Sequence, residues 1–187
     1  MRMLAAYLIS MNKYYLDGVL VVEGKDDVSY LSSFIDTLYF TTNGYDISEE
    51  KLNFLSRVAS VNKVYLLTDN DEAGIQIADK IKSKINGVFE IKTPKIFKKS
   101  TNKYGVAETT QTEIIRAFKD LLKPCVKCSN NGQYNLASLI SLSSSPSESK
   151  YNLISKYRLI GGNIKSLEKQ LKMLRISKEE INQFLCK

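Results

Sequence analysis

Two short acidic stretches, each at the end of an apolar run, limit what this chain can fold into. One occupies residues 19–27 and the other residues 64–74, and each runs from apolar residues typical of a buried strand into carboxylates and then a glycine. In an open parallel sheet, ligands bind just beyond the carboxyl ends of the strands. We therefore expect one shared acidic pocket, formed by Glu23 after the first strand and by Asp69 and Asp71 after the second.

The spacing of these carboxylates suits a hard divalent cation. Asp69 and Asp71 are separated by one residue, so their side chains can converge at a strand end or in a turn. Mg²⁺ prefers oxygen ligands and keeps several waters, so one or two carboxylates and a substrate phosphate are enough to bind it. Glu23 would hold a second ion or handle a proton, and Lys25 would offset phosphate charge. The pocket is predicted to cleave a phosphodiester backbone, although two aspartates at this spacing also occur in ordinary surface turns.

The chain contains no histidine, which removes Ser-His-Asp and Cys-His chemistry and every histidine general base. Three cysteines are present, and Cys125 and Cys128 form one CxxC pair without the second pair that a structural zinc site needs. Catalysis is therefore expected to depend on carboxylates, lysine, tyrosine or a bound metal.

The apolar residues alternate between strand and helix spacing as far as residue 91. Strands are expected at residues 18–22, 39–42, 63–68 and 88–91, and helices at 26–38, 49–60 and 72–84. This order predicts an α/β fold with a largely parallel sheet flanked by helices. A further helix is expected over residues 110–122.

After residue 123 the pattern indicates a small, entirely helical module. Helix starts are indicated at Ser145, Asn163 and Ser177, where capping residues precede helical spacing of apolar side chains. The predicted domains are an N-terminal extension at residues 1–17, an α/β catalytic domain at 18–123 and a basic helical module at 124–187.

The net charge of +7 is carried by the C-terminal third of the chain, because Lys and Arg balance Asp and Glu through residue 120. A basic module beside a neutral body favours a polyanionic partner, with RNA, DNA and an acidic membrane all open. A solvated, lysine-rich helical surface would have the same composition. A second basic stretch, residues 92–105, contains Lys98, Lys99 and Lys103 and no acid, and it is either a solvated charge run or a phosphate-binding loop.

The sequence lacks the features of an exported or membrane-spanning protein. No apolar run approaches the roughly 18 residues that a membrane span needs. Residues 1–16 lack the residue order and the cleavage site of a signal peptide. We therefore expect a cytoplasmic protein.

The motifs at the strand ends resemble those of the Toprim domain. The matching residues are Glu23 to Asp27, Thr42-Asn43-Gly44 and Thr68 to Asp71 with Gly74. The resemblance is narrower than the Toprim domain alone, since Lys98, Lys99 and the stretches 103–108, 113–117, 157–163 and 174–180 look like the ribonuclease M5 family of 5S ribosomal RNA maturases. It covers roughly residues 18–185.

The resemblance implies a Mg²⁺-dependent endoribonuclease that cleaves double-stranded precursor 5S rRNA. It places Glu23 on the catalytic glutamate and Asp69 and Asp71 on the metal-binding pair. The implied partners are precursor 5S rRNA and, in some relatives, the 5S-binding large-subunit ribosomal protein or the large ribosomal subunit, on which the C-terminal module docks. The RNA-binding residues expected are Lys25, Asn43, Lys98, Lys99, Lys103, Arg158, Lys165, Lys172 and Arg175, with Asp27 and Glu108 in supporting roles.

Two positions depart from the family pattern. Ile75 follows Gly74 where the family often has an acid, for which Glu72 would compensate, and Thr109 stands where the family often has histidine. Three other functions stay open: another Toprim nucleic-acid enzyme such as a DNA nuclease or primase, a phospho-accepting receiver domain, and a non-catalytic RNA-binding module. The acids of Asp26 and Asp27 also have a plainer role as first-turn residues that favour the helix dipole.

Overall fold

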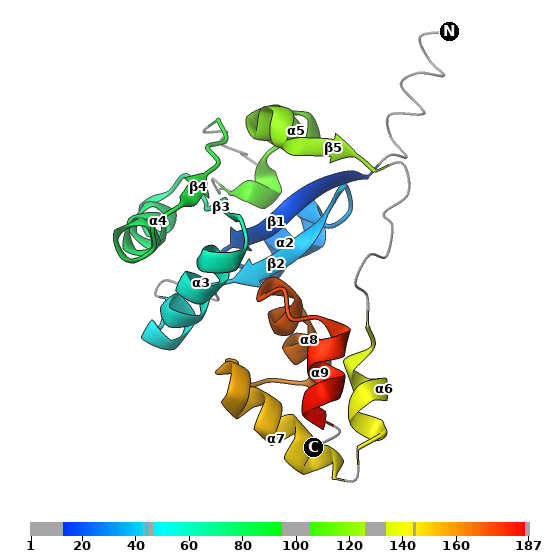
Figure 1. The fold of residues 1–187 in the computed structure, drawn as a ribbon. Coiled ribbons are helices and arrows are strands. Elements are labelled where there is room, and N and C mark those ends of the chain that lie inside the picture. Colours follow the sequence, from blue (N-terminus) through cyan, green and yellow to red (C-terminus); the bar gives the residue numbers. More distant parts are fainter. Residues whose placement is uncertain are drawn as a thin grey trace, which may run out of the picture. The chain divides into compact units, whose positions relative to one another are not determined.

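The computed structural model describes residues 13–42, 44, 47–94, 105–125, 134–143 and 145–185 (Figure 1). The chain divides into two compact units, and each is described by itself. In the described chain, the first unit contains the residues up to Ile47 and from Lys63 to Cys125, and the second contains Ser48–Asn62 and the residues from Tyr134 onward.

The first unit is built on a five-stranded sheet in which the order of four strands is β2-β1-β3-β4. Its strands are β1 (Tyr14–Val22), β2 (Ile35–Thr41), β3 (Val64–Leu66), β4 (Val88–Glu90) and β5 (Leu122–Pro124). The first four are parallel to one another, and β5 pairs antiparallel with the first residues of β1. The predicted α/β fold with a largely parallel sheet is confirmed.

Strand β1 is the centre of this sheet. Val19, Leu20, Val21 and Val22 are all buried, which explains why this strand reads as a continuous apolar run and not as an alternating one. Gly18 allows the close approach of the neighbouring chain, because a Cβ atom there would lie 2.8 Å from the backbone oxygen of Lys63. A larger residue at this position would therefore separate β1 from the start of β3.

The helical segments of the first unit are α2 (Lys25–Leu31), α4 (Glu72–Lys84), η1 (Val106–Glu108), α5 (Gln111–Phe118) and η2 (Lys119–Leu121). The main core joins the sheet to α2 and α5, with Leu20 of β1, Leu31 of α2 and Ile114 of α5 each fully buried. The bounds predicted for the helix over residues 72–84 are confirmed by α4.

Several predicted boundaries in the first unit are wrong, including the start of β2, which is expected at residue 39 and lies at Ile35. The helix expected over 26–38 ends at Leu31, and Ile35 begins β2, because Ile35 and Leu38 satisfy helical spacing as well as strand pairing. Strand β1 begins at Tyr14, four residues before the expected start at residue 18. The helix expected over 110–122 ends at Phe118, since Lys119 turns the chain with a φ of 48° into η2 and then β5.

The second unit is helical. It contains α3 (Glu49–Val61), α6 (Leu136–Ser141), α7 (Pro146–Tyr157), α8 (Ile164–Met173) and α9 (Lys178–Leu185). The expected helix start at Asn163 is confirmed, because its side chain accepts a hydrogen bond from the Ser166 N–H at 2.9 Å. The expected start at Ser177 is confirmed by two hydrogen bonds between Ser177 and Glu180. The Ser145 side chain makes no such bond, although α7 begins there as predicted. Helix α6 was not predicted.

Helix α3 packs with the C-terminal helices although it lies between β2 and β3 in the sequence. The Arg57 guanidinium donates to the backbone oxygen of Tyr157 at 2.7 Å and to that of Arg158 at 3.0 Å, at the end of α7. The Asn62 amide donates to the Met173 oxygen at 3.3 Å, and Arg175 donates to Asn62 at 3.1 Å. The second unit is therefore assembled from two separate segments of the chain.

In the described part of the chain, no helix is both long enough and apolar enough to cross a membrane.

Candidate active site

The two acidic strand ends are joined by a direct hydrogen bond. Glu23 lies one residue beyond the end of β1, and its Oε1 accepts from the backbone N–H of Asp69 at 2.7 Å. Asp69 lies just beyond β3, the strand that pairs with β1. The structure thus brings Glu23 and Asp69 together at the carboxyl edge of the sheet.

The environment of Glu23 disfavours its charged form. Burial, together with the negative charges of Asp69, Asp71 and Asp27, raises the pKa of Glu23 to about 7, although the hydrogen bond from the Asp69 N–H acts in the opposite direction. A carboxyl group with this pKa exchanges a proton readily near neutral pH. The repulsion among these acids also means that a bound cation would be favoured here.

Asp69 and Asp71 are held by different parts of the backbone. The Asp69 Oδ1 accepts from the N–H of Val106 at 2.7 Å, which ties the end of β3 to η1. The Asp71 Oδ1 accepts from the Gly74 N–H at 2.8 Å, so Asp71 caps α4. Asp71 therefore has a structural role in addition to its place near Glu23.

These carboxylates fit a sparsely ligated Mg²⁺ better than a closed metal cage. Within the described residues, no group of three acidic, histidine or cysteine side chains is arranged to hold a metal ion. The donors are all carboxylate oxygens, which suit a hard cation that keeps waters and uses one or two protein ligands with substrate phosphate. Asp69, from a loop that also contacts Glu23, is the most suitable first ligand.

Gly74 lies at the site, although the motif spacing predicts no separate role for it. A Cβ atom at this position would lie 2.2 Å from the backbone oxygen of Asp69 and 2.6 Å from the Glu23 Oε1. Any side chain would therefore push the start of α4 away from both acidic strand ends. In the sequence, this requirement is visible only as a glycine three residues after Asp71.

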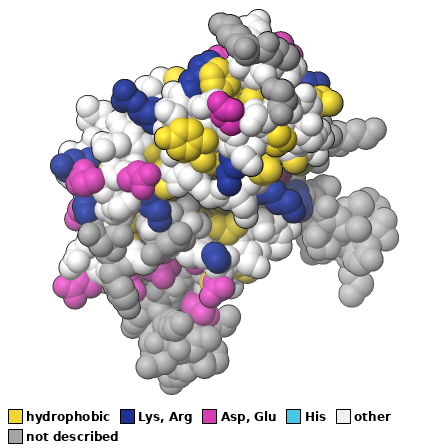
Figure 2. All heavy atoms as spheres, turned by 90° about the horizontal axis from the view of Figure 1, so that it is seen from below, with side chains coloured by type: hydrophobic (Ala, Val, Ile, Leu, Met, Phe, Trp, Pro, Cys, Tyr) yellow, Lys and Arg dark blue, Asp and Glu magenta, His cyan; other side chains and the backbone are white. Residues whose placement is uncertain are grey.

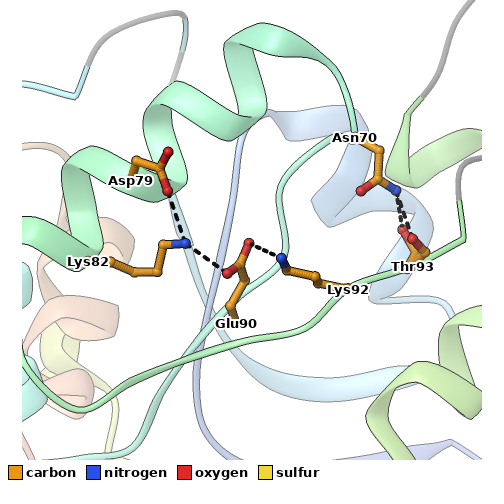
Figure 3. A network of polar contacts seen from close by, with 6 residues as sticks. All are labelled: Asn70, Asp79, Lys82, Glu90, Lys92 and Thr93. Carbon is orange, nitrogen blue, oxygen red and sulfur yellow. Dashed lines mark hydrogen bonds and ion pairs between the residues drawn. The ribbon is translucent and has the colours of Figure 1, made fainter.

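Asn70 connects the acidic loop, which is the segment 67–71 between β3 and α4, to the segment after β4. Its Nδ2 donates to the backbone oxygen and to the Oγ1 of Thr93, each at 3.0 Å (Figure 3). Thr93 is buried and lies at the start of the basic stretch 92–105, while Val106, bonded to Asp69, follows that stretch. The acidic loop thus contacts the residues on both sides of residues 94–105.

A second polar network in Figure 3 lies between α4 and β4 and does not involve the acids of the loop. Lys82 contacts Asp79 at 3.0 Å and Glu90 at 2.8 Å, and Lys92 lies 3.9 Å from Glu90. Exposed ion pairs of this kind contribute about 0 to 1 kcal/mol. We regard this network as surface structure.

The other predicted site residues of the first unit take several positions. Lys25 is exposed at the start of α2, and Asp27 is buried, accepting from the Gly24 N–H at 2.9 Å. Burial raises the pKa of Asp27. Glu108 is half-buried at the end of η1. Asn43, Lys98, Lys99 and Lys103 lie outside the described residues.

The two departures from the family pattern have different surroundings. Thr109 is buried, its Oγ1 donates to the Gly105 oxygen at 3.1 Å, and its own backbone oxygen accepts from the Tyr30 hydroxyl at 2.7 Å. Ile75 is 48% exposed on α4. Thr109 therefore holds η1 against α2.

The predicted RNA-binding residues of the second unit lie around α7 and α8. Arg158 and Lys165 are exposed, Lys172 pairs with Glu168, and Arg175 donates to Asn62. On the face drawn in Figure 2, Lys and Arg side chains alternate with acidic ones, and hydrophobic side chains lie among them. The charge on that face is therefore divided into small local clusters and does not form one uniform positive surface.

Comparison with known proteins finds similarity to a Toprim-like family and to Ribonuclease M5 proteins. Residues 20–104 match a family model described as Toprim-like. The chain is 29% identical to Ribonuclease M5 of Mycoplasma pneumoniae over 91% of this chain and 95% of that protein. It is 25% identical to Ribonuclease M5 of Mycoplasma genitalium, covering 89% and 93%, and 28% identical to Ribonuclease M5 of Borreliella burgdorferi, covering 90% and 92%.

A small TOPRIM domain protein from Bacillus stearothermophilus is a similar solved structure, with a TM-score of 0.48 and 22% identity over 55% of this chain and 86% of that one. The resemblance expected from the sequence motifs is confirmed by the family model and by the relatives. Residues 20–104 are thus similar to Toprim-like domains, and the similarity to Ribonuclease M5 proteins covers 91% of the chain and so extends beyond that segment.

Proposed function

We propose that this protein is a Mg²⁺-dependent endoribonuclease that cleaves double-stranded precursor 5S rRNA. The observation that supports the proposal is the bond from the Asp69 N–H to Glu23, because it joins the two strand ends that carry the proposed proton-exchanging group, Glu23, and the proposed metal ligand, Asp69. The similarity to Ribonuclease M5 proteins over nine-tenths of the chain supports RNA as the substrate.

In this mechanism Glu23 handles the proton and the two aspartates hold the cation. When bound, Mg²⁺ would supply positive charge to the phosphate and make an attacking water more acidic. Glu23 would take a proton from that water, whose oxygen forms a bond to phosphorus as the bond to the leaving ribose oxygen breaks, and the proton would then pass from Glu23 to the leaving oxygen. The bond from the Asp69 N–H holds the Glu23 carboxyl next to the backbone of Asp69.

The remaining predicted residues would bind the RNA. Lys25, exposed next to Glu23, would contact the phosphate beside the cut. Lys98, Lys99 and Lys103 belong to the stretch whose flanks are bonded to the acidic loop at Asn70 and Asp69, which supports a role close to the cleavage site. The other residues predicted to bind RNA are Asn43 in the first unit and Arg158, Lys165, Lys172 and Arg175 in the second.

The test is cleavage of precursor 5S rRNA by the purified protein with Mg²⁺. Glu23→Gln and Asp69→Asn keep the oxygen that accepts from Asp69 N–H and from Val106 N–H, so they remove charge with little change in structure. Each is expected to reduce the cleavage rate by about 100-fold or more. Asp79→Asn, in an exposed ion pair on α4, is the matched control and should cleave at the wild-type rate.

Equal cleavage by wild type and Asp69→Asn would contradict the site. Cleavage of DNA but not of this RNA would indicate another Toprim enzyme. RNA binding without cleavage by the wild-type protein would indicate a binding module. Adding the 5S-binding ribosomal protein in a parallel reaction tests whether that partner increases the rate.

A further inference from the structure

The second unit has a surface pocket that the proposed cleavage does not use. It has a volume of about 500 Å³ and lies at the end of α7 and along α9, lined by Lys156, Tyr157, Glu180, Gln183 and Phe184. A volume of this size is sufficient for a small organic group such as a nucleoside. All five lining residues belong to the second unit, so the pocket is complete within it.

Two aromatic rings and one ammonium group dominate this pocket. The rings of Tyr157 and Phe184 meet edge to face, with centroids 6.3 Å apart and an interplanar angle of 72°. The Lys156 Nζ lies 4.2 Å from the centroid of Phe184 and 5.1 Å from that of Tyr157. Both rings are half-buried while Lys156 is exposed, so the rings are held by packing and the lysine can move.

The backbone at this end of α7 is fixed. The Tyr157 oxygen accepts from Arg57 at 2.7 Å, and Arg158 adopts a left-handed conformation with a φ of 44°. The Tyr157 ring therefore lies on a fixed helix end, which reduces the entropy cost of binding a flat ligand against it.

The polar groups of the pocket match the parts of an unpaired nucleotide. An aromatic ring stacks on a base of any sequence, and an adjacent ammonium group binds the phosphate. Glu180 and Gln183, both exposed, provide an acceptor and an amide that suit the amino and ring-nitrogen edge of a base. The excess positive charge of the C-terminal third favours a polyanion over a neutral peptide.

We propose that this pocket binds one unpaired base of the RNA, stacked on Phe184 and Tyr157, while Lys156 moves from the ring face to the adjoining phosphate. The inference deepens the proposed function, on which it rests for RNA as the ligand. It predicts that the protein distinguishes a duplex with an unpaired nucleotide from a perfect duplex.

The test measures binding of the full chain to two RNA hairpins that differ by a single unpaired nucleotide. Fluorescence anisotropy in EDTA gives each affinity without cleavage. Wild type should bind the bulged hairpin about ten-fold more tightly, since stacking one base on an aromatic side chain is worth about that much. Phe184→Leu keeps the apolar volume but removes the ring, and it should bind both hairpins equally.

Tyr151→Leu is the matched control, because Tyr151 is an aromatic residue on α7 that is 71% exposed and does not line the pocket. It should keep the ten-fold preference. With 2-aminopurine as the unpaired base, wild type and Tyr151→Leu should quench its fluorescence, and Phe184→Leu should not.

The possible failures are distinguishable. If wild type binds both hairpins equally, or if Phe184→Leu keeps the preference and the quenching, the base pocket is wrong and the proposed cleavage is unaffected. If wild type binds neither hairpin, RNA recognition itself is wrong, and the base pocket fails with it. Thermal unfolding of each variant shows whether a lost preference comes from a lost fold.

Discussion

The acidic loop of the first unit and the aromatic pocket of the second differ in what holds their side chains. At the acidic loop and the neighbouring end of β1, the carboxylates of Asp69, Asp71 and Glu23 each accept a hydrogen bond from a backbone N–H. In the pocket, the ammonium group of Lys156 contacts the faces of two rings, and the lysine is exposed to solvent. Backbone donors fix atoms in position, whereas an exposed lysine can follow its ligand.

This difference matches the two tasks that we propose. Breaking a phosphodiester bond needs reacting groups held in one geometry, because small displacements are costly to the rate. Recognising an RNA whose bases vary needs stacking surfaces and mobile charges. Three measurements test this difference between the two regions.

The largest effect is expected from Gly74→Ala in the rigid acidic loop. The new Cβ would lie 2.2 Å from the Asp69 oxygen, and a backbone atom cannot move away without displacing the end of β3. We expect a loss of about 3 kcal/mol in the free energy of unfolding, measured by urea denaturation. Gln76→Ala, at an exposed position of the same helix, should change it by less than about 0.5 kcal/mol. A loss below about 1 kcal/mol for Gly74→Ala would show that the loop is not rigid.

The second effect concerns pH and the charge of Glu23. Its pKa is raised in the folded protein from 4.5 to about 7, so the folded state holds this proton more tightly than the unfolded state does. Between these two values the folded state binds more protons, and stability therefore falls as pH rises from about 4.5 to about 7. The total fall from this group is about 2 to 3 kcal/mol.

Urea denaturation in EDTA at pH 5 and pH 7.5 measures this fall. Glu23→Gln cannot ionise and should lose this part of the pH dependence, while the part from Asp27 stays in both proteins. The same pH dependence in wild type and Glu23→Gln would mean that the carboxyl is well solvated.

The smallest effect is expected from Tyr134→Phe in the second unit. Its buried hydroxyl has no partner in the described chain, so removing it should raise the free energy of unfolding by about 1 kcal/mol. Tyr30→Phe, in the first unit, is the opposite case, since its hydroxyl donates to the Thr109 oxygen at 2.7 Å. That variant should lose about 1 kcal/mol. A destabilised Tyr134→Phe would indicate a bound water that satisfies the hydroxyl.

The sequence predicted the parallel sheet and its acidic edge because both depend on local patterns. The helix over 72–84 has three independent signals, which are the cap at Asp71, the apolar spacing and the turn at Asn86-Gly87. The strand β5 has none, since it is three residues long and pairs with Tyr14 to Leu16, more than a hundred positions earlier. Local periodicity contains no information about such distant pairing.

The contacts that organise the acidic loop were hidden for the same reason. The Asp69 N–H and the Val106 N–H are backbone groups, and no side chain in the sequence reveals where a backbone N–H points. The packing of α3 with the C-terminal helices was also missed, because its apolar residues, including Leu52 and Leu55, would suit a sheet face equally well. The assignment of the catalytic, metal-binding and RNA-binding residues stays a prediction until the variants are measured.

The position of α3 in the chain has a consequence for how the two units can be separated or exchanged. A deletion after residue 125 would remove Tyr157, Arg158 and Met173, to which Arg57 and Asn62 donate, and would leave α3 without its partners. A chimera that takes its C-terminal unit from a relative must therefore also take residues 48–62 from that relative. The second unit is a discontinuous module. Exchanging it between relatives therefore requires two junctions inside the Toprim-like region and one junction after it.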